Sequence, residues 1–79
     1  MMSRDEARAR AENFLDEEVR SRIPFDVVII ETAIGDGGDA WIFPYDGRGW
    51  VERGDARELL AGNAPVSVSK RDGAVRYNI

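Results

Sequence analysis

The stretch GNAPVSVSKRDGAVRYN, residues 62–78, predicts an antiparallel β-hairpin and is the starting point for the fold prediction. Val66 and Val68 alternate with serines, and this period of two is typical of a strand with one apolar face. The connection, residues 70–73, ends at Gly73, which supplies a backbone conformation with positive φ. The returning strand carries an apolar side chain at every second position: Val75, Tyr77 and Ile79.

A short helix is predicted directly before this hairpin, over residues 56–61. Asp55 occupies the N-cap position and Glu58 follows three residues later. Gly62 lies just beyond the expected C-terminus, and Pro65 prevents the helix from resuming. We expect the helix to bury two neighbouring leucines: Leu59 and Leu60.

A longer amphipathic helix is predicted at the N-terminus, from Ser3 to about Arg20. Ser3 and Glu6 have the spacing of a capping box. The apolar residues that follow recur at helical spacing and form one stripe: Ala7, Ala11, Phe14, Leu15 and Val19. Pro24 ends this region, because the residue before a proline is driven towards an extended conformation.

Two strands are predicted between the helices. Residues 25–34 are rich in β-branched side chains and place four residues on one face of a strand: Phe25, Val27, Ile29 and Ala33. After a glycine-rich turn, aromatic side chains alternate along a second strand: Trp41, Phe43 and Tyr45. Because Pro44 has no N–H, we expect this strand to lie at a sheet edge or to be bulged there.

These elements predict a single α+β domain over residues 1–79. The N-terminal amphipathic helix would pack on a small antiparallel sheet of about four strands, with the short helix before the C-terminal hairpin. The segment DGRG, residues 46–49, is expected to turn the chain, and Trp50 and Val51 to add a short strand.

The residue types present exclude most catalytic chemistry. The chain has no His and no Cys, so it contains no nucleophile–His pair and no imidazole or thiolate metal site. Ser69 and Lys70 are not expected to form a catalytic Ser–Lys pair, because neighbouring side chains in a strand point to opposite faces. Asp36 and Asp39 lack the pattern of an EF-hand loop. We therefore predict no catalytic residue, no metal site and no cofactor.

The net charge of −4 is unevenly distributed. Residues 23–52 contain six acids and one base, which disfavours nucleic-acid binding, because phosphate contacts need clustered Lys and Arg. An acidic middle is compatible with docking a basic protein. The longest apolar run, residues 27–30, is too short to span a bilayer, and the charged N-terminus does not resemble a signal peptide. We expect a cytoplasmic protein with no membrane partner.

Among the aromatic residues, Trp50 is the one expected to be exposed, since it lies in a predicted turn near Arg48. Trp and Arg are enriched at binding hot spots. The other aromatics on the predicted strand are expected to form the hydrophobic face of the sheet.

The segments AWIFPYD, residues 40–46, and VERGDARELLAGNAPVSVSKRDGAV, residues 51–75, resemble the immunity protein 35 (YrhB-like) family. The positions that carry the resemblance are Trp41, Phe43, Tyr45, Gly54, Asp55, Leu60, Gly62, Asn63, Pro65, Val68, Asp72 and Gly73. The departures are small: Ala64 stands where glycine is frequent, and Ser69 where aspartate is frequent.

The resemblance implies a non-enzymatic protein-binding module, an immunity protein that neutralises a cognate bacterial toxin by direct binding. The residues expected to meet a toxin with a basic active site are Asp36, Asp39, Asp46, Arg48, Trp50 and Glu52. A holdase-like or housekeeping protein that binds unfolded chains is the alternative, because exposed aromatics and sheet edges also suit that role. We expect a monomer or a weak homodimer.

Overall fold

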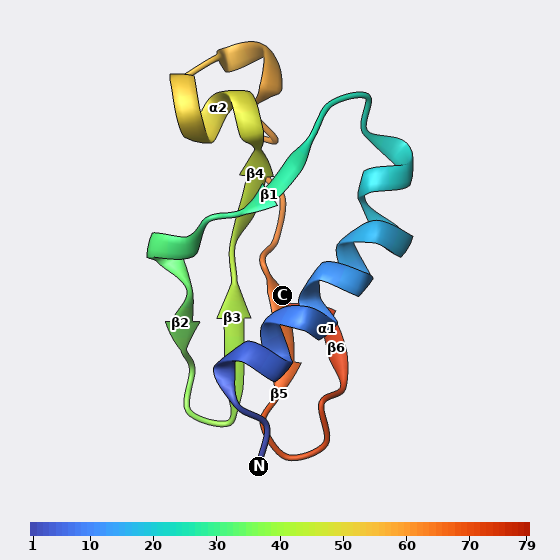
Figure 1. Cartoon of the computed structure of the whole chain (residues 1–79), viewed down its shortest axis with the longest axis vertical. Coiled ribbons are helices and arrows are strands. Elements are labelled where there is room, and N and C mark those ends of the chain that lie inside the picture. The colour runs from blue at the N-terminus through green and yellow to red at the C-terminus, as the bar shows by residue number, and fades with distance from the viewer.

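The computed structural model describes residues 1–79 and shows one long helix, one short helix and six strands (Figure 1). The helices are α1 (Arg4–Glu18) and α2 (Arg48–Arg53), and the chain also contains three 3-10 turns: η1 (Arg20–Arg22), η2 (Glu31–Ala33) and η3 (Ala56–Glu58). The strands are β1 (Val27–Ile29), β2 (Gly35–Asp36), β3 (Ala40–Phe43), β4 (Tyr45–Gly47), β5 (Val66–Ser69) and β6 (Val75–Tyr77). The predicted α+β class is confirmed.

The N-terminal helix begins with the predicted capping box. The backbone N–H of Glu6 donates to the Ser3 hydroxyl at 3.2 Å, and the Ser3 N–H donates to the Glu6 carboxylate at 3.1 Å. The apolar stripe of α1 packs on β5, β3 and β6, and Figure 1 shows the helix lying across one face of that sheet. Ala7, Ala11 and Leu15 are completely buried there.

The larger sheet has the strand order β2-β3-β5-β6, and all its pairs are antiparallel. The C-terminal hairpin forms as predicted, with Gly73 at φ +73°. Phe43 lies opposite Val66 and both are completely buried, so the aromatic strand and the hairpin share one apolar face. Ile79 lies outside β6 and is exposed, so the returning strand is shorter than expected.

The predicted strand over residues 25–34 is divided in two. Its first part, β1, pairs with β4 in a separate two-stranded sheet, and its last part gives way to η2 and then to β2. Ile30 N–H donates to the Pro44 carbonyl at 2.9 Å, but Pro44 has no N–H to return the bond. The ladder stops at this pair, and Ala33 is exposed instead of facing the core.

The predicted edge position of Pro44 is wrong. The strand before it, β3, lies between β2 and β5, and the strand after it, β4, pairs with β1. Pro44 therefore marks the point at which the chain passes from the larger sheet into the smaller one.

The region after β4 also differs from expectation. Residues 46–47 belong to β4, and Trp50 and Val51 lie in α2 instead of a strand. The predicted helix over residues 56–61 is reduced to the single turn η3, in which Asp55 accepts a hydrogen bond from the Arg57 N–H at 3.0 Å. Leu59 is exposed, contrary to the expected burial, whereas Leu60 packs against the core.

Candidate functional site

Residues 48–60, here called the α2–η3 corner, form one end of the molecule (Figure 1). Apart from Met1 and Ile79 near the chain ends, every exposed large hydrophobic residue of the chain lies in this corner: Trp50, Val51 and Leu59. Their exposed fractions are 37%, 41% and 39%. Exposed apolar side chains mark candidate surfaces for binding another protein when they form a contiguous patch.

The corner is held to the sheet by a buried carboxylate. Asp46 is only 8% exposed, and its Oδ1 accepts hydrogen bonds from the backbone N–H groups of Gly47, at 2.8 Å, and Leu60, at 2.7 Å. These bonds join the two ends of the corner at one point. The predicted partner-binding residue Asp46 is therefore engaged within the fold.

A second carboxylate fixes the start of α2. Glu58 accepts a hydrogen bond from the Gly49 N–H at 2.9 Å, which satisfies a helix N-terminal donor that has no partner within the helix. A Cβ atom at Gly47 would lie 2.0 Å from the Glu58 carbonyl oxygen, and one at Gly49 would lie 2.5 Å from the Glu58 carboxyl group. Only glycine at both positions lets Glu58 pack so closely against the start of α2. This packing of α2 against η3 takes the place of the turn and the short strand expected from the sequence.

A groove of about 380 Å³, here called the α1–α2 groove, lies beside the corner. Its apolar floor is made by Val28 and Ile30, from β1 and the residue after it, and by Val51 of α2. Its rim is charged, with side chains from α1, η2 and α2: Arg8, Glu12, Glu31, Arg48 and Glu52. Segments from four parts of the chain thus meet at one opening.

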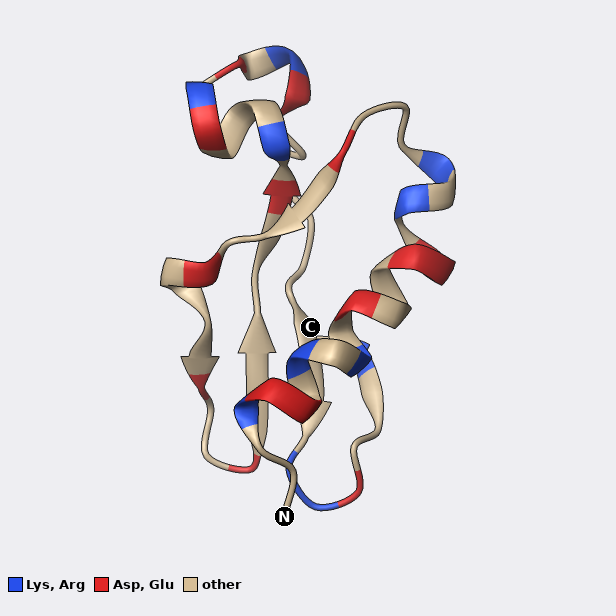
Figure 2. Cartoon of the chain, in the orientation of Figure 1, with Lys and Arg blue, Asp and Glu red and all other residues tan.

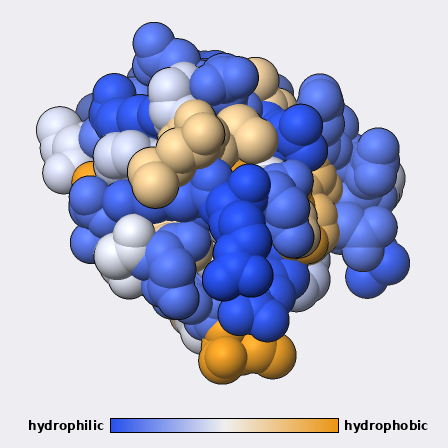
Figure 3. All heavy atoms as spheres, turned by 90° about the horizontal axis from the view of Figure 1, so that it is seen from below, coloured by the Kyte–Doolittle hydropathy of each residue, from blue (hydrophilic) through white to orange (hydrophobic).

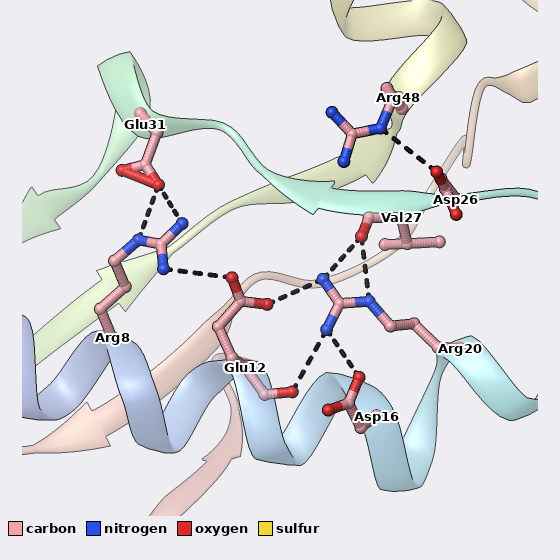
Figure 4. A network of polar contacts seen from close by, with 8 residues as sticks. All are labelled: Arg8, Glu12, Asp16, Arg20, Asp26, Val27, Glu31 and Arg48. Carbon is pink, nitrogen blue, oxygen red and sulfur yellow. Dashed lines mark hydrogen bonds and ion pairs between the residues drawn. The ribbon is translucent and has the colours of Figure 1, made fainter.

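A network of ion pairs follows one side of this groove (Figure 4). Arg8 pairs with Glu31 of η2 and, at 3.1 Å, with Glu12 of α1. Glu12 in turn pairs with Arg20 at 2.7 Å. The hydrogen bond with Glu31 raises the pKa of Arg8 above its ordinary value, so this guanidinium stays charged.

Arg20 connects the network to the edge of β1. Its Nε and Nη2 donate to the Val27 carbonyl oxygen at 3.0 and 2.7 Å, and its Nη1 donates to Asp16 at 2.8 Å (Figure 4). The side chain therefore binds backbone and carboxylates together. It connects α1 to β1.

Arg48 occupies the other side of the groove. It pairs with Asp26, just before β1, at 3.3 Å and with Glu52, one turn along α2, at 3.0 Å. Hydrogen bonds to Glu52 and Asp26 raise the pKa of Arg48 above its ordinary value. The guanidinium joins α2 to the start of β1 and remains charged.

The six predicted partner-binding residues do not form one patch. Arg48, Trp50 and Glu52 lie together on α2, whereas Asp36 and Asp39 lie at the other end of the molecule, around the turn between β2 and β3 (Figures 1 and 2). Figure 3 views that end, and hydrophilic residues cover most of it.

Asp36 pairs with Lys70, whose ammonium lies 4.4 Å from the centre of the Trp41 ring. The hydrogen bond from Lys70 lowers the pKa of Asp36, and the Gly38 N–H adds to this effect. Asp36 thus stabilises its own end of the sheet.

The groove residues on α1, β1 and η2 were not predicted. Each of them has an ordinary local role in the sequence, as part of a helix face or a strand. No local spacing connects Glu12, Val28 and Glu31 with α2, because the chain brings them together only through β1–β4 pairing and the packing of α1. The exposure of Val51 and Leu59 was missed as well, because both were assigned to other elements.

The arrangement suits contacts with another macromolecule. It offers exposed apolar side chains, an open groove and fixed charges, all of which are features of protein interfaces. No group of three or more His, Cys, Asp or Glu side chains is placed to hold a metal ion. No helix has both the length and the apolar character needed to cross a membrane.

Comparison with known proteins identifies the family. The family model described as immunity protein 35 matches residues 5–77. The uncharacterized protein YrhB of Escherichia coli (strain K12) is 31% identical over 75 residues, which cover 95% of this chain and 72% of that protein. No solved structure matches. The chain belongs to the immunity protein 35 family.

Proposed function

We propose that this chain is an immunity protein that binds a cognate protein toxin directly and neutralises it by covering its surface, without catalysis. Family membership supports an immunity-type role. The single observation that carries the binding mode is the exposure of Trp50, Val51 and Leu59 within one corner of the fold.

The proposed interface is centred on Trp50. Trp50 is 37% exposed, and tryptophan is among the residue types enriched at binding hot spots. Arg48 and Glu52 pair with each other one turn apart on α2, and Trp50, two residues from each, projects from a different side of the helix. The proposal places Asp36 and Asp39 outside this interface, because they lie at the far end of the sheet (Figure 2).

Internal contacts hold the backbone of the corner in place without any partner. Asp46 and Glu58 hold its backbone through three hydrogen bonds to N–H groups, and glycines bring the two segments into contact. Binding to a preformed surface loses less conformational entropy than binding that must first order a loop. This supports recognition of one partner with a fixed shape over broad capture of unfolded chains.

The test is co-expression with each candidate toxin found by sequencing the genes beside the one that encodes this chain. We expect the chain to restore growth and to co-purify with the toxin in a stoichiometric complex. Trp50→Ala is expected to weaken the complex by about 30-fold, the effect of losing a hot spot worth roughly 2 kcal/mol. Because Trp50 is partly exposed, the melting temperature of the variant should change little.

Asp39→Asn is the control, since it changes a charge at the far end of the molecule and should leave affinity unchanged. Two results would contradict the proposal: no rescue and no complex with the toxin, or weak protection of many unrelated unfolded proteins with no dependence on Trp50.

A further inference from the structure

We propose that the α1–α2 groove binds a basic segment of the partner protein, with one apolar side chain on the groove floor and Lys or Arg side chains on its rim. This inference rests on the proposed function, because it names the chemistry of the partner segment that would meet this side of the corner. The groove is continuous with the corner, since Val51 belongs to both.

The floor of the groove favours an apolar side chain. Val28 and Ile30 are half-buried, and Val51 is 41% exposed, so all three still present apolar surface to the opening. A volume of about 380 Å³ is at the small end of the roughly 300–1,000 Å³ range for small-molecule pockets. It suits an inserted side chain and the backbone that carries it better than a cofactor.

The rim favours positive charge. Every arginine in the groove network is already paired with an acid of this chain: Arg8, Arg20 and Arg48. Their acidic partners are more numerous: Glu12, Asp16, Asp26, Glu31 and Glu52. Of these acids, Glu12, Glu31 and Glu52 line the groove together with Arg8 and Arg48, so three acids against two bases leave one excess negative charge at the opening. The neighbouring pair of Arg53 and Glu58 adds one charge of each sign and leaves this excess unchanged.

The carboxylates of the rim retain free acceptor capacity. The side chains of Glu31 and Glu52 are 52% and 51% exposed, and a carboxylate accepts about four hydrogen bonds. An incoming Lys or Arg can therefore bind Glu31 or Glu52 without displacing Arg8 or Arg48. An incoming acid would find both arginines engaged and would be repelled by the excess negative charge.

The same charges disfavour two other occupants. Nucleic acid presents phosphates, which need free Lys and Arg side chains, and the groove arginines are paired. A second copy of this chain carries a net charge of −4, so two copies repel each other at an acidic rim.

The test uses the full chain labelled with ¹⁵N and three synthetic pentapeptides with blocked ends. The first is Gly-Arg-Leu-Arg-Gly, the second replaces both arginines by Glu, and the third replaces Leu by Ser. We expect the first to shift the amide signals of Val28, Ile30 and Val51 in a saturable way. The peptide with Glu is expected to bind at least about tenfold more weakly because of like-charge repulsion, and the peptide with Ser about tenfold more weakly because it lacks the apolar anchor.

Two variants of the protein test the apolar contact with the groove floor and the charge contacts with its rim. Val51→Ser should weaken the leucine peptide about tenfold and leave the serine peptide unchanged, because only the first uses the floor. Glu31→Gln combined with Glu52→Gln should weaken both basic peptides and reduce their salt dependence. The matched control is Asp36→Asn combined with Asp39→Asn, which removes two charges from the far end and should leave peptide binding unchanged.

Equal binding of the basic and acidic peptides, or shifts confined to the turn between β2 and β3, would overturn the inference. These outcomes are separable from failure of the proposed function, because the peptide experiment needs no toxin. If Val51→Ser and the combination of Glu31→Gln with Glu52→Gln still neutralise the toxin normally, the proposal that the groove binds the partner is overturned. The corner around Trp50 would then remain as the proposed interface. Loss of neutralisation with these variants, at unchanged melting temperature, would support the groove.

Discussion

The α1–sheet body and the α2–η3 corner of this small protein are stabilised in opposite ways. The body, which is the chain outside residues 48–60, contains all ten residues of the hydrophobic core. These residues come from α1 and its C-cap and from strands β1, β3, β4 and β5. In the corner, Gly49 is the one buried residue; Trp50, Val51 and Leu59 are exposed, whereas Leu60 packs against the core. Backbone hydrogen bonds to Asp46 and Glu58 give the corner its shape.

Because its stability comes mainly from the body, a domain of 79 residues can leave apolar surface exposed in the corner for a partner. Burial of side chains stabilises the body, because each apolar group removed from water contributes free energy. The corner is held by hydrogen-bonded carboxylates and close glycine packing, and three of its large apolar side chains remain exposed.

Truncating a core residue should have the largest effect. Phe43 is completely buried, and Phe43→Ala is expected to reduce the free energy of unfolding by about 3–5 kcal/mol. Leu59→Ala in the corner should change it by less than about 1 kcal/mol, because Leu59 is already exposed. Urea denaturation measures both. If Phe43→Ala does not fold, Phe43→Leu should still be destabilised, by about 1 kcal/mol. Equal effects at positions 43 and 59 would refute the comparison.

Adding one methyl group should disrupt the corner. Gly47→Ala places a Cβ 2.0 Å from the Glu58 carbonyl oxygen, and we expect a loss of about 2–3 kcal/mol. The Leu60 amide, which donates to Asp46, should lose protection from hydrogen exchange. Gly35→Ala is the matched control, since its Cβ would meet no atom within 4 Å. Retained protection in Gly47→Ala would show that the close packing is not required.

Removing Arg20 tests the connection between α1 and β1. Arg20→Met leaves the Val27 carbonyl and Glu12 without this partner, and we expect a loss of about 1–2 kcal/mol, reduced by the partial exposure of the side chain. Arg22→Met is the control, because Arg22 lies in the same 3-10 turn and is exposed. Thermal unfolding of the two variants gives the comparison, and equal melting temperatures would argue against a structural role for Arg20.

The smallest effect concerns the pH dependence of stability at the far end of the sheet. Lys70 lowers the pKa of Asp36 in the folded state, so this contribution to stability is present above the unfolded-state pKa, about 4, and is lost as the pH falls through the folded-state pKa. Asp36→Asn should therefore be slightly less stable than the wild type at pH 7, and the difference should vanish once the pH lies below the folded-state pKa of Asp36. A difference that persists in acid would assign the effect to something other than the carboxylate.

The local elements with strong internal signals were predictable. The capping box at Ser3, the stripe on α1 and the Val-Ser hairpin with its glycine turn all appear as expected, because each depends on residues close together in sequence. The exposure of Trp50 was also expected. The resemblance to the immunity protein family was carried by residues of the aromatic strand, of the segment after α2 and of the hairpin.

The remaining features depend on contacts between distant residues. Nothing local to Gly49 shows that Glu58 will cap α2, and nothing in the strand pattern shows that Pro44 will end one sheet and begin another. The groove is likewise assembled from α1, β1, η2 and α2. The sequence by itself determined the α+β class, the long helix and the hairpin, because short-range spacing and turn chemistry specify them. Only the tertiary structure decided where the apolar side chains of the corner point, because that choice depends on which backbone groups find a partner far along the chain.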